Sequence, residues 1–136
     1  MGDESAIDSL VAAFYGVFDN RAGRVPTAAA FGSLFAPSAS IVTHGRGEPQ
    51  VSTPAAFVQP RIVLLTGGEL VDFREWETES HTEISGTLAT RRSRYAKQGV
   101  LRAEPYAGAG TKHFQFAKTA SGWRIMALSW IDDPID

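Results

Sequence analysis

The sequence predicts an α+β domain in which helices come first and a meander of antiparallel strands follows. Three observations support this fold class: an apolar stripe with helical spacing near the N-terminus, proline and glycine signals that delimit two further helices, and four long strand-like segments in the C-terminal half. Helices and strands do not alternate along the chain, which argues against a parallel sheet. At 136 residues, the chain is expected to form a single domain over 1–136.

The first helix is expected over residues 5–20, because apolar side chains recur there at steps of three and four residues. They are Ile7, Leu10, Val11, Phe14 and Phe18. A second helix is expected from Thr27. A third begins at Thr53, because Pro54 suits the first helical position. Pro60 should kink or end this third helix before the glycine pair at 67–68.

The strands of the C-terminal half are expected at 71–84, 87–97, 111–119 and 123–132. A shorter hairpin is expected from Ser40 to His44, with a turn at 45–47. A turn at 85–86 would pair Glu79 with Arg92 and Glu77 with Arg94. In that register one face is charged and wet; it carries Glu75, Glu77, Glu79, His81 and Glu83.

The opposite face of this hairpin is a candidate cavity lining. Trp76 and Tyr95 supply apolar bulk, while Thr78, Ser93 and Arg91 supply polar groups. Such a mixture is typical of a small-molecule pocket. The alternative is a sheet whose polar members lie near an open end and meet water.

The last hairpin is apolar on both faces. One core cannot cover both, so the sequence predicts a homodimer through the second face. That face comprises Phe114, Phe116, Met126, Leu128 and Trp130. The alternative is that helices or the C-terminal tail cover it.

The segment from Ser121 to Ile125 (SGWRI) resembles the last strand of the nuclear transport factor 2-like superfamily. The motif Glu83-Ile84-x-Gly86-x-x-Ala89, followed by Ser93 and Tyr95, is similar to its small bacterial SnoaL-like branch, grouped with polyketide cyclases. The resemblance implies a curved sheet wrapped as a cone around helices (a cystatin-like fold), a pocket at the open end, and frequent dimerisation. It implies no particular reaction, because this scaffold hosts isomerases, dehydratases, cyclases and proteins without catalysis.

The resemblance also implies that alternate residues after Trp123 face the cavity, which would place His113 and Gln115 inside beside Ile125, Ala127 and Ser129. His113 is then the best candidate for acid–base catalysis, with Tyr95 or Tyr15 as hydrogen-bond donor. The full set of expected pocket residues is Tyr15, His44, Trp76, Arg91, Tyr95, His113, Gln115 and Ser129.

Composition argues against other classes of function. The chain has no Cys and only three His, so we expect no metal site and no cofactor. A net charge of −2 disfavours a nucleic-acid partner. The acidic N-terminus disfavours a signal peptide. The longest apolar run covers only residues 62–65, which disfavours a membrane partner. A cytoplasmic location is the simplest expectation.

Three functional hypotheses follow from the sequence. The first is a domain that binds a small, partly apolar ligand in its cone. The second is an isomerase, dehydratase or cyclase that uses acid–base chemistry in the same pocket. The third is a dimerisation module whose cavity is filled by its own side chains. Whether the chain is an enzyme is left open.

Overall fold

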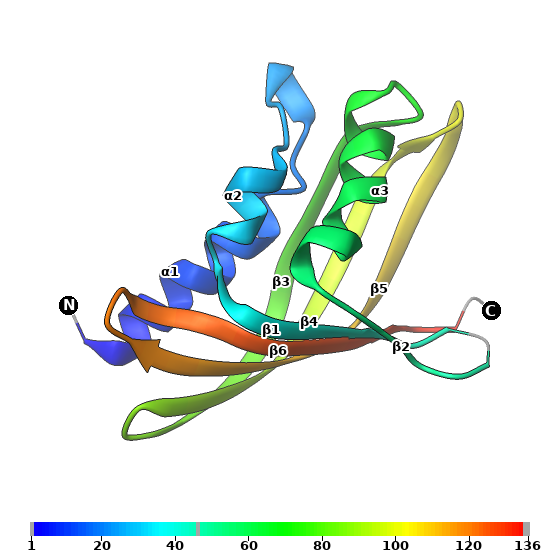
Figure 1. Ribbon diagram of the computed structural model, residues 1–136. Coiled ribbons are helices and arrows are strands. Elements are labelled where there is room, and N and C mark those ends of the chain that lie inside the picture. Colours follow the sequence, from blue (N-terminus) through cyan, green and yellow to red (C-terminus); the bar gives the residue numbers. More distant parts are fainter. Residues whose placement is uncertain (1, 46, 135–136) are drawn as a thin grey trace.

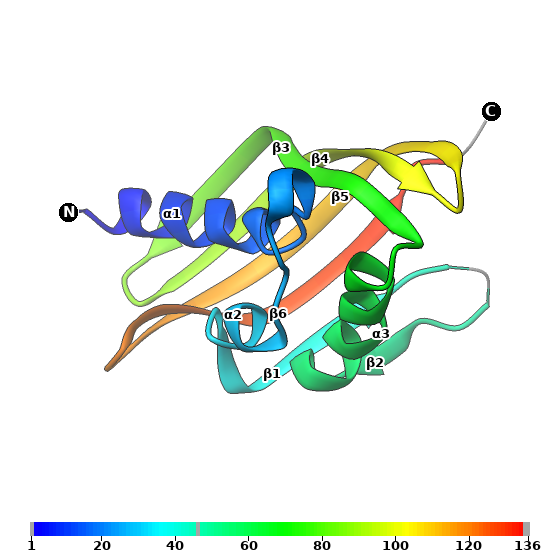
Figure 2. The ribbon, with the colours of Figure 1, turned by 90° about the horizontal axis from the view of Figure 1, so that it is seen from above.

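A curved six-stranded sheet carries three α-helices on its concave face in the computed structural model, which describes residues 2–45 and 47–134 (Figures 1 and 2). The helices are α1 (Asp3–Gly16), α2 (Ala28–Gly32) and α3 (Pro54–Thr66), with a short 3₁₀ turn at Arg21–Gly23. The strands are β1 (Phe35–Thr43), β2 (Gln50–Ser52), β3 (Leu70–Ser85), β4 (Leu88–Leu101), β5 (Glu104–Thr119) and β6 (Gly122–Asp132).

The strand order is β2-β1-β6-β5-β4-β3, and only β1 and β6 run parallel among these pairs. The sheet is therefore mixed and open, with β2 and β3 at its edges. This arrangement confirms the expected α+β class. The β1–β2 hairpin is also present, although part of the turn expected at 45–47 lies outside the described residues.

The helices pack with the apolar stripe that the sequence predicts. Ile7, Val11 and Phe14 of α1 are almost fully buried, and the Phe14 ring meets the Phe114 ring of β5 edge-on at 5.2 Å between centroids. Pro60 does not end α3, which continues to Thr66. Because proline has no backbone N–H, Pro60 cannot donate a hydrogen bond to the carbonyl of Ala56. Ala56 is exposed, so water can donate to that carbonyl instead.

The β4–β5 hairpin is longer than predicted. Arg102 and Ala103 form its two-residue turn, with φ of +47° and +69°. Positive φ at both central residues is what a tight hairpin with the natural twist requires. The sequence prediction began this strand at residue 111, but in the structure β5 already begins at Glu104 and includes the glycines and proline at 105–110.

A bulge at Thr78 changes which side chains of β3 face the helices. On the C-terminal side of the bulge, Thr82 pairs with Arg91, and Glu79 pairs with Arg94 rather than with the expected Arg92. On the N-terminal side of the bulge, Glu77 pairs with Tyr95. Because side chains of a strand alternate between its two faces, one extra residue exchanges the faces of the residues on one side of the bulge relative to those on the other. Glu75 and Glu77 therefore point toward the helices, and the prediction that they face water is wrong. Trp76 points the other way.

A second bulge, at Met126 in β6, reverses the last strand in the same manner. Gln115 pairs with Ala127, but Phe116 pairs with Ile125. As a result Trp123 and Ile125 face the helices before the bulge, and Leu128 and Trp130 face them after it. The predicted dimer face is wrong, because Phe114, Phe116 and Leu128 are buried inside the protomer. The alternative, that helices cover these residues, is the one that the structure shows.

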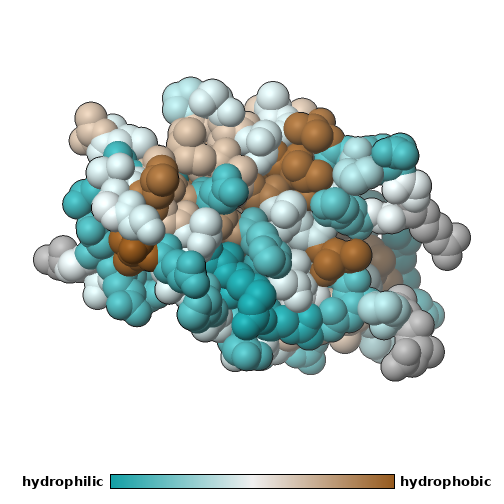
Figure 3. All heavy atoms as spheres, turned by 90° about the horizontal axis from the view of Figure 1, so that it is seen from below, coloured by the Kyte–Doolittle hydropathy of each residue, from teal (hydrophilic) through white to brown (hydrophobic). Residues whose placement is uncertain are grey.

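The outer face of the sheet is largely polar, with separate apolar patches (Figure 3). It carries the exposed side chains of His113 and Gln115, which the resemblance placed inside. No helix within residues 2–45 and 47–134 is long and apolar enough to cross a membrane.

Candidate functional site

A cavity of about 420 Å³ opens between helices α1 and α3 and strands β3 to β6. Its volume lies within the range of about 300–1,000 Å³ that is usual for small-molecule sites. One part of its wall is apolar and mostly aromatic: Phe14, Phe18, Phe57, Leu64, Phe73 and Trp130. Pro60, Leu65 and Leu70 complete this apolar part. The remaining lining residues are Tyr95, Tyr106 and five charged side chains: Arg61, Glu75, Lys97, Lys112 and Asp132.

Lys112 and Glu75 form a nearly buried ion pair in the cavity wall. The Lys112 Nζ lies 2.7 Å from Glu75 Oε1, and 7% and 10% of the two side chains are exposed. Nζ also lies 3.7 Å from the centre of the Tyr95 ring, a cation–π contact. Burial lowers the pKa of Lys112, and the Glu75 carboxylate opposes that shift. Apart from Lys112, no donor among the described residues reaches Glu75 Oε1.

Asp132 is held by two donors at the other side of the cavity. The Tyr95 hydroxyl donates to Asp132 Oδ1, and Lys97 Nζ donates to Oδ2 at 3.0 Å. Burial alone would raise the pKa of Asp132, but these hydrogen bonds outweigh it and lower the pKa. The Tyr95 hydroxyl reaches Asp132 across Gly110, where an added Cβ would lie 2.3 Å from that hydroxyl oxygen.

Arg61 projects from α3 into the same cavity. Its guanidinium carbon lies 3.6 Å from the centre of the Phe57 ring, and Nη1 donates to the Phe57 carbonyl at 3.0 Å. The guanidinium makes no ion pair among the described residues, in contrast to Lys97 and Lys112. Burial lowers the pKa of Arg61, and the Glu75 and Asp132 carboxylates oppose that shift from a distance.

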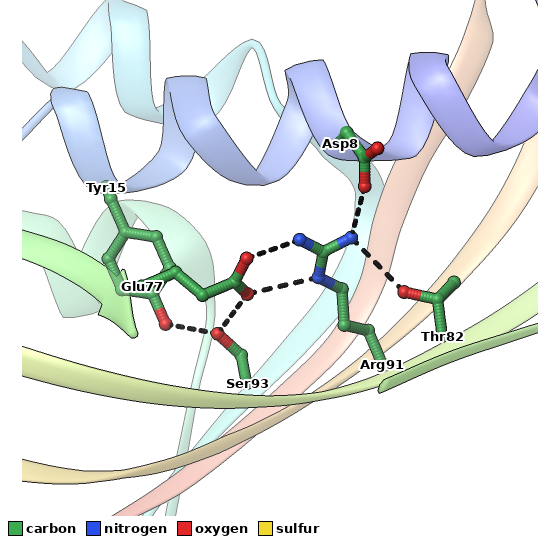
Figure 4. A network of polar contacts seen from close by, with 6 residues as sticks. All are labelled: Asp8, Tyr15, Glu77, Thr82, Arg91 and Ser93. Carbon is green, nitrogen blue, oxygen red and sulfur yellow. Dashed lines mark hydrogen bonds and ion pairs between the residues drawn. The ribbon is translucent and has the colours of Figure 1, made fainter. Parts of the chain in front are cut away.

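A separate polar network joins α1 to β3 and β4 (Figure 4). Arg91 donates to both carboxylate oxygens of Glu77, to Asp8 Oδ1 at 2.6 Å and to Thr82 Oγ1 at 3.2 Å. Ser93 Oγ donates to Glu77 Oε2 at 2.5 Å and shares a hydrogen bond of 2.7 Å with the Tyr15 hydroxyl. The network contains Arg91 and Tyr15, two of the expected pocket residues. Neither lines the cavity.

The structure separates most of the residues that the sequence expected in one pocket. Tyr95 lines the cavity, and Tyr15 lies behind it, with 6.5 Å between their ring centres. Trp76, Gln115 and Ser129 lie on the outer face of the sheet, and His44 is exposed beyond the end of β1. His113, the candidate acid–base residue, is exposed on that outer face as well, so it does not reach the cavity.

The sequence reasoning missed the charged residues that do line the cavity. A signal for Lys112 was available, because Lys112 alternates with Phe114 and Phe116 and must share their face. Glu75 and Asp132 could be placed only with knowledge of the two bulges. Among the described residues no three His, Cys, Asp or Glu side chains gather closely enough to hold a metal ion.

Comparison with known proteins identifies the fold. No protein-family model matches the chain, and no curated protein matches it in sequence. Among solved structures, a nuclear transport factor 2-like superfamily protein from Salmonella enterica serovar Typhimurium superposes with a TM-score of 0.77 at 14% identity, covering 97% of this chain and 92% of that one.

Two proteins from Novosphingobium aromaticivorans are similar as well. One, provisionally named an aromatic ring hydroxylase, has a TM-score of 0.76 at 20% identity and covers 98% of this chain and 92% of its own. The other, an NTF2-like protein with a cystatin-like fold, has a TM-score of 0.72 at 17% identity. The superposition covers 94% of this chain and 80% of that one. The chain therefore has the nuclear transport factor 2-like, cystatin-like fold, as its sequence resemblance implied. The finer resemblance to the SnoaL-like branch stays a prediction.

Proposed function

We propose that this chain binds a small molecule with an apolar, flat body in the cavity between α1, α3 and the sheet. The observation that carries the proposal is the combination of an aromatic wall with converging polar groups in about 420 Å³. A cavity of this volume also argues against the hypothesis of a dimerisation module filled by its own side chains.

The proposal is tested by filling the cavity from α3. Leu64 lines the cavity, whereas its neighbour Val63 is 66% exposed. We expect the neutral probe 2-naphthol to bind the unmodified protein in an NMR titration that follows the Trp130 indole. Leu64→Trp should weaken this binding at least tenfold, because the larger ring occupies the site.

Val63→Trp is the matched control, since it adds the same side chain one residue away on the exposed face. It should bind 2-naphthol as the unmodified protein does. The proposal is wrong if 2-naphthol binds none of the three proteins, or if both variants bind it equally well.

A second candidate function, acid–base catalysis in the same cavity, is favoured by Glu75. This carboxylate is 90% buried beside Lys112, and no other donor among the described residues reaches its Oε1. A desolvated carboxylate next to a cation is a common arrangement for proton transfer. Glu75 thus replaces His113 as the candidate for an isomerase, dehydratase or cyclase.

If the chain catalyses such a reaction, Glu75→Gln should lower kcat by about 100-fold or more while ligand affinity changes little. His113→Gln should leave kcat unchanged, because its side chain lies outside the cavity. Equal turnover by Glu75→Gln and the unmodified protein would exclude Glu75 as the proton-transferring group.

A further inference from the structure

The five charged side chains of the cavity do not balance one another. Arg61, Lys97 and Lys112 carry three positive charges, and Glu75 and Asp132 carry two negative charges. Each carboxylate is already engaged by a lysine: Glu75 by Lys112 at 2.7 Å, and Asp132 by Lys97 at 3.0 Å. Among the described residues, Arg61 is therefore the cation of the cavity lining that forms no direct ion pair, although Glu75 and Asp132 act on it from a greater distance.

Arg61 is also placed to receive a ligand. Its guanidinium lies against the Phe57 ring at 3.6 Å and within 5.7 Å of the Trp130 ring. One nitrogen is used by the Phe57 carbonyl, and a guanidinium has five N–H donors, so others are available. A partly buried cation without an anionic partner is unfavourable, and an incoming anion would relieve that cost.

We infer that the ligand of this cavity is an aromatic carboxylate, whose ring lies against the aromatic wall and whose carboxylate pairs with Arg61. This inference rests on the proposed function, because it names the chemical class of the ligand for the same cavity. The planar guanidinium suits a planar carboxylate, to which it can donate two parallel hydrogen bonds.

The two carboxylates of the cavity, Glu75 and Asp132, limit which other groups the ligand can carry. Glu75 Oε1 is buried, and Lys112 is the one donor among the described residues that reaches it. A neutral donor on the ring, such as a hydroxyl group, would therefore be tolerated near Glu75, whereas a second carboxylate would meet Glu75 and Asp132. The site is thus expected to take monocarboxylates in preference to dicarboxylates.

The experiment compares three probes with the same ring and different charge: 2-naphthoate, 2-naphthamide and 2-naphthylmethylammonium. We expect the unmodified protein to bind the carboxylate at least tenfold more tightly than the amide, and the ammonium compound least tightly. Arg61→Gln should remove the preference for the carboxylate while affinity for the amide changes less than threefold. Arg61→Lys, which keeps the charge, should retain part of the preference.

Arg74→Gln is the matched control. Arg74 also lies over an aromatic ring, with its guanidinium carbon 3.8 Å from the Trp76 ring centre, but it does not line the cavity. Its loss should leave all three affinities unchanged. If the carboxylate and the amide bind equally and Arg61→Gln changes neither, the ligand class is wrong while the binding function stands. If none of the three probes binds, the proposed function itself fails.

Discussion

At the scale of single residues, Gly110 decides how one side of the cavity is built. It lies between Tyr95 and Asp132 in neighbouring strands, and a Cβ there would lie 2.3 Å from the Tyr95 hydroxyl and 2.5 Å from the Ile131 carbonyl oxygen. Because one of these atoms belongs to the backbone, the clash cannot be relieved by a side-chain rotation alone. The hydrogen bond between Tyr95 and Asp132 therefore requires glycine at this position.

We expect Gly110→Ala to lower the free energy of unfolding by about 1–3 kcal/mol, the usual effect of overpacking. Gly108→Ala is the control on the same strand. Its Cβ would meet only the flexible end of Lys97, at 2.9 Å, so its effect should stay below about 1 kcal/mol. Urea unfolding measures both variants, and equal losses would contradict the role given to Gly110.

At the scale of elements, Arg91 fastens α1 to the sheet. Its side chain is 5% exposed and contacts Glu77 of β3 and Asp8 of α1, whose side chains are 20% and 57% exposed. Since Glu77 is the more buried partner, most of the energetic consequence of losing Arg91 should come from leaving Glu77 without a cation.

Arg91→Leu is expected to lower the free energy of unfolding by about 3–5 kcal/mol, because it leaves a largely buried carboxylate unpaired. Asp8→Ala should lose less than about 1 kcal/mol, since that partner is exposed. Replacing both Arg91 and Glu77 by Leu should recover part of the loss, which a double-mutant cycle in urea would measure. A double variant no more stable than Arg91→Leu would show that the charge on Glu77 is not the cause.

At the scale of the whole molecule, paired ionisable groups set the pH range of stability. Hydrogen bonds and ion pairs lower the pKa of Asp3, Asp19, Asp132 and Asp133. Stabilisation from a lowered carboxyl pKa is present above the unfolded value near 3.8 and is lost as the pH falls through the folded value. Burial raises the pKa of Tyr15 and Tyr95, so their contribution is present below about pH 10 and is lost above it.

Asp19 gives the clearest test on the acid side, because hydrogen bonds from Arg21 lower its pKa to about 2. Its 16% exposed side chain should contribute at most about 2 kcal/mol at pH 6. We expect the stability difference between the unmodified protein and Asp19→Asn to shrink toward zero between pH 4 and about pH 2. Arg21→Gln should reproduce this behaviour in urea unfolding at several pH values. A difference independent of pH would contradict the assignment.

The order of elements and the core of α1 were predictable from the sequence, because they depend on local periodicity. Ile7, Leu10 and Phe14 recur at helical spacing and are buried as expected. The four long strands were also predictable, apart from the ends of the β4–β5 hairpin. Its turn at Arg102 and Ala103 has no glycine, so it carried no recognisable turn signal.

The sequence by itself therefore determined the class of fold and indicated the nuclear transport factor 2-like fold, which the comparison with solved structures then identified. The tertiary structure decided which residues face the cavity, because the extra residues at Thr78 and Met126 reverse the alternation of β3 and β6. These bulges bring Glu75 and Trp130 inside with Lys112, and they leave Trp76 and Ser129 outside. The alternation of side chains along a strand is easy to recognise in a sequence. Which of the two alternating sets faces the helices after a bulge, however, depends on pairing with the neighbouring strands.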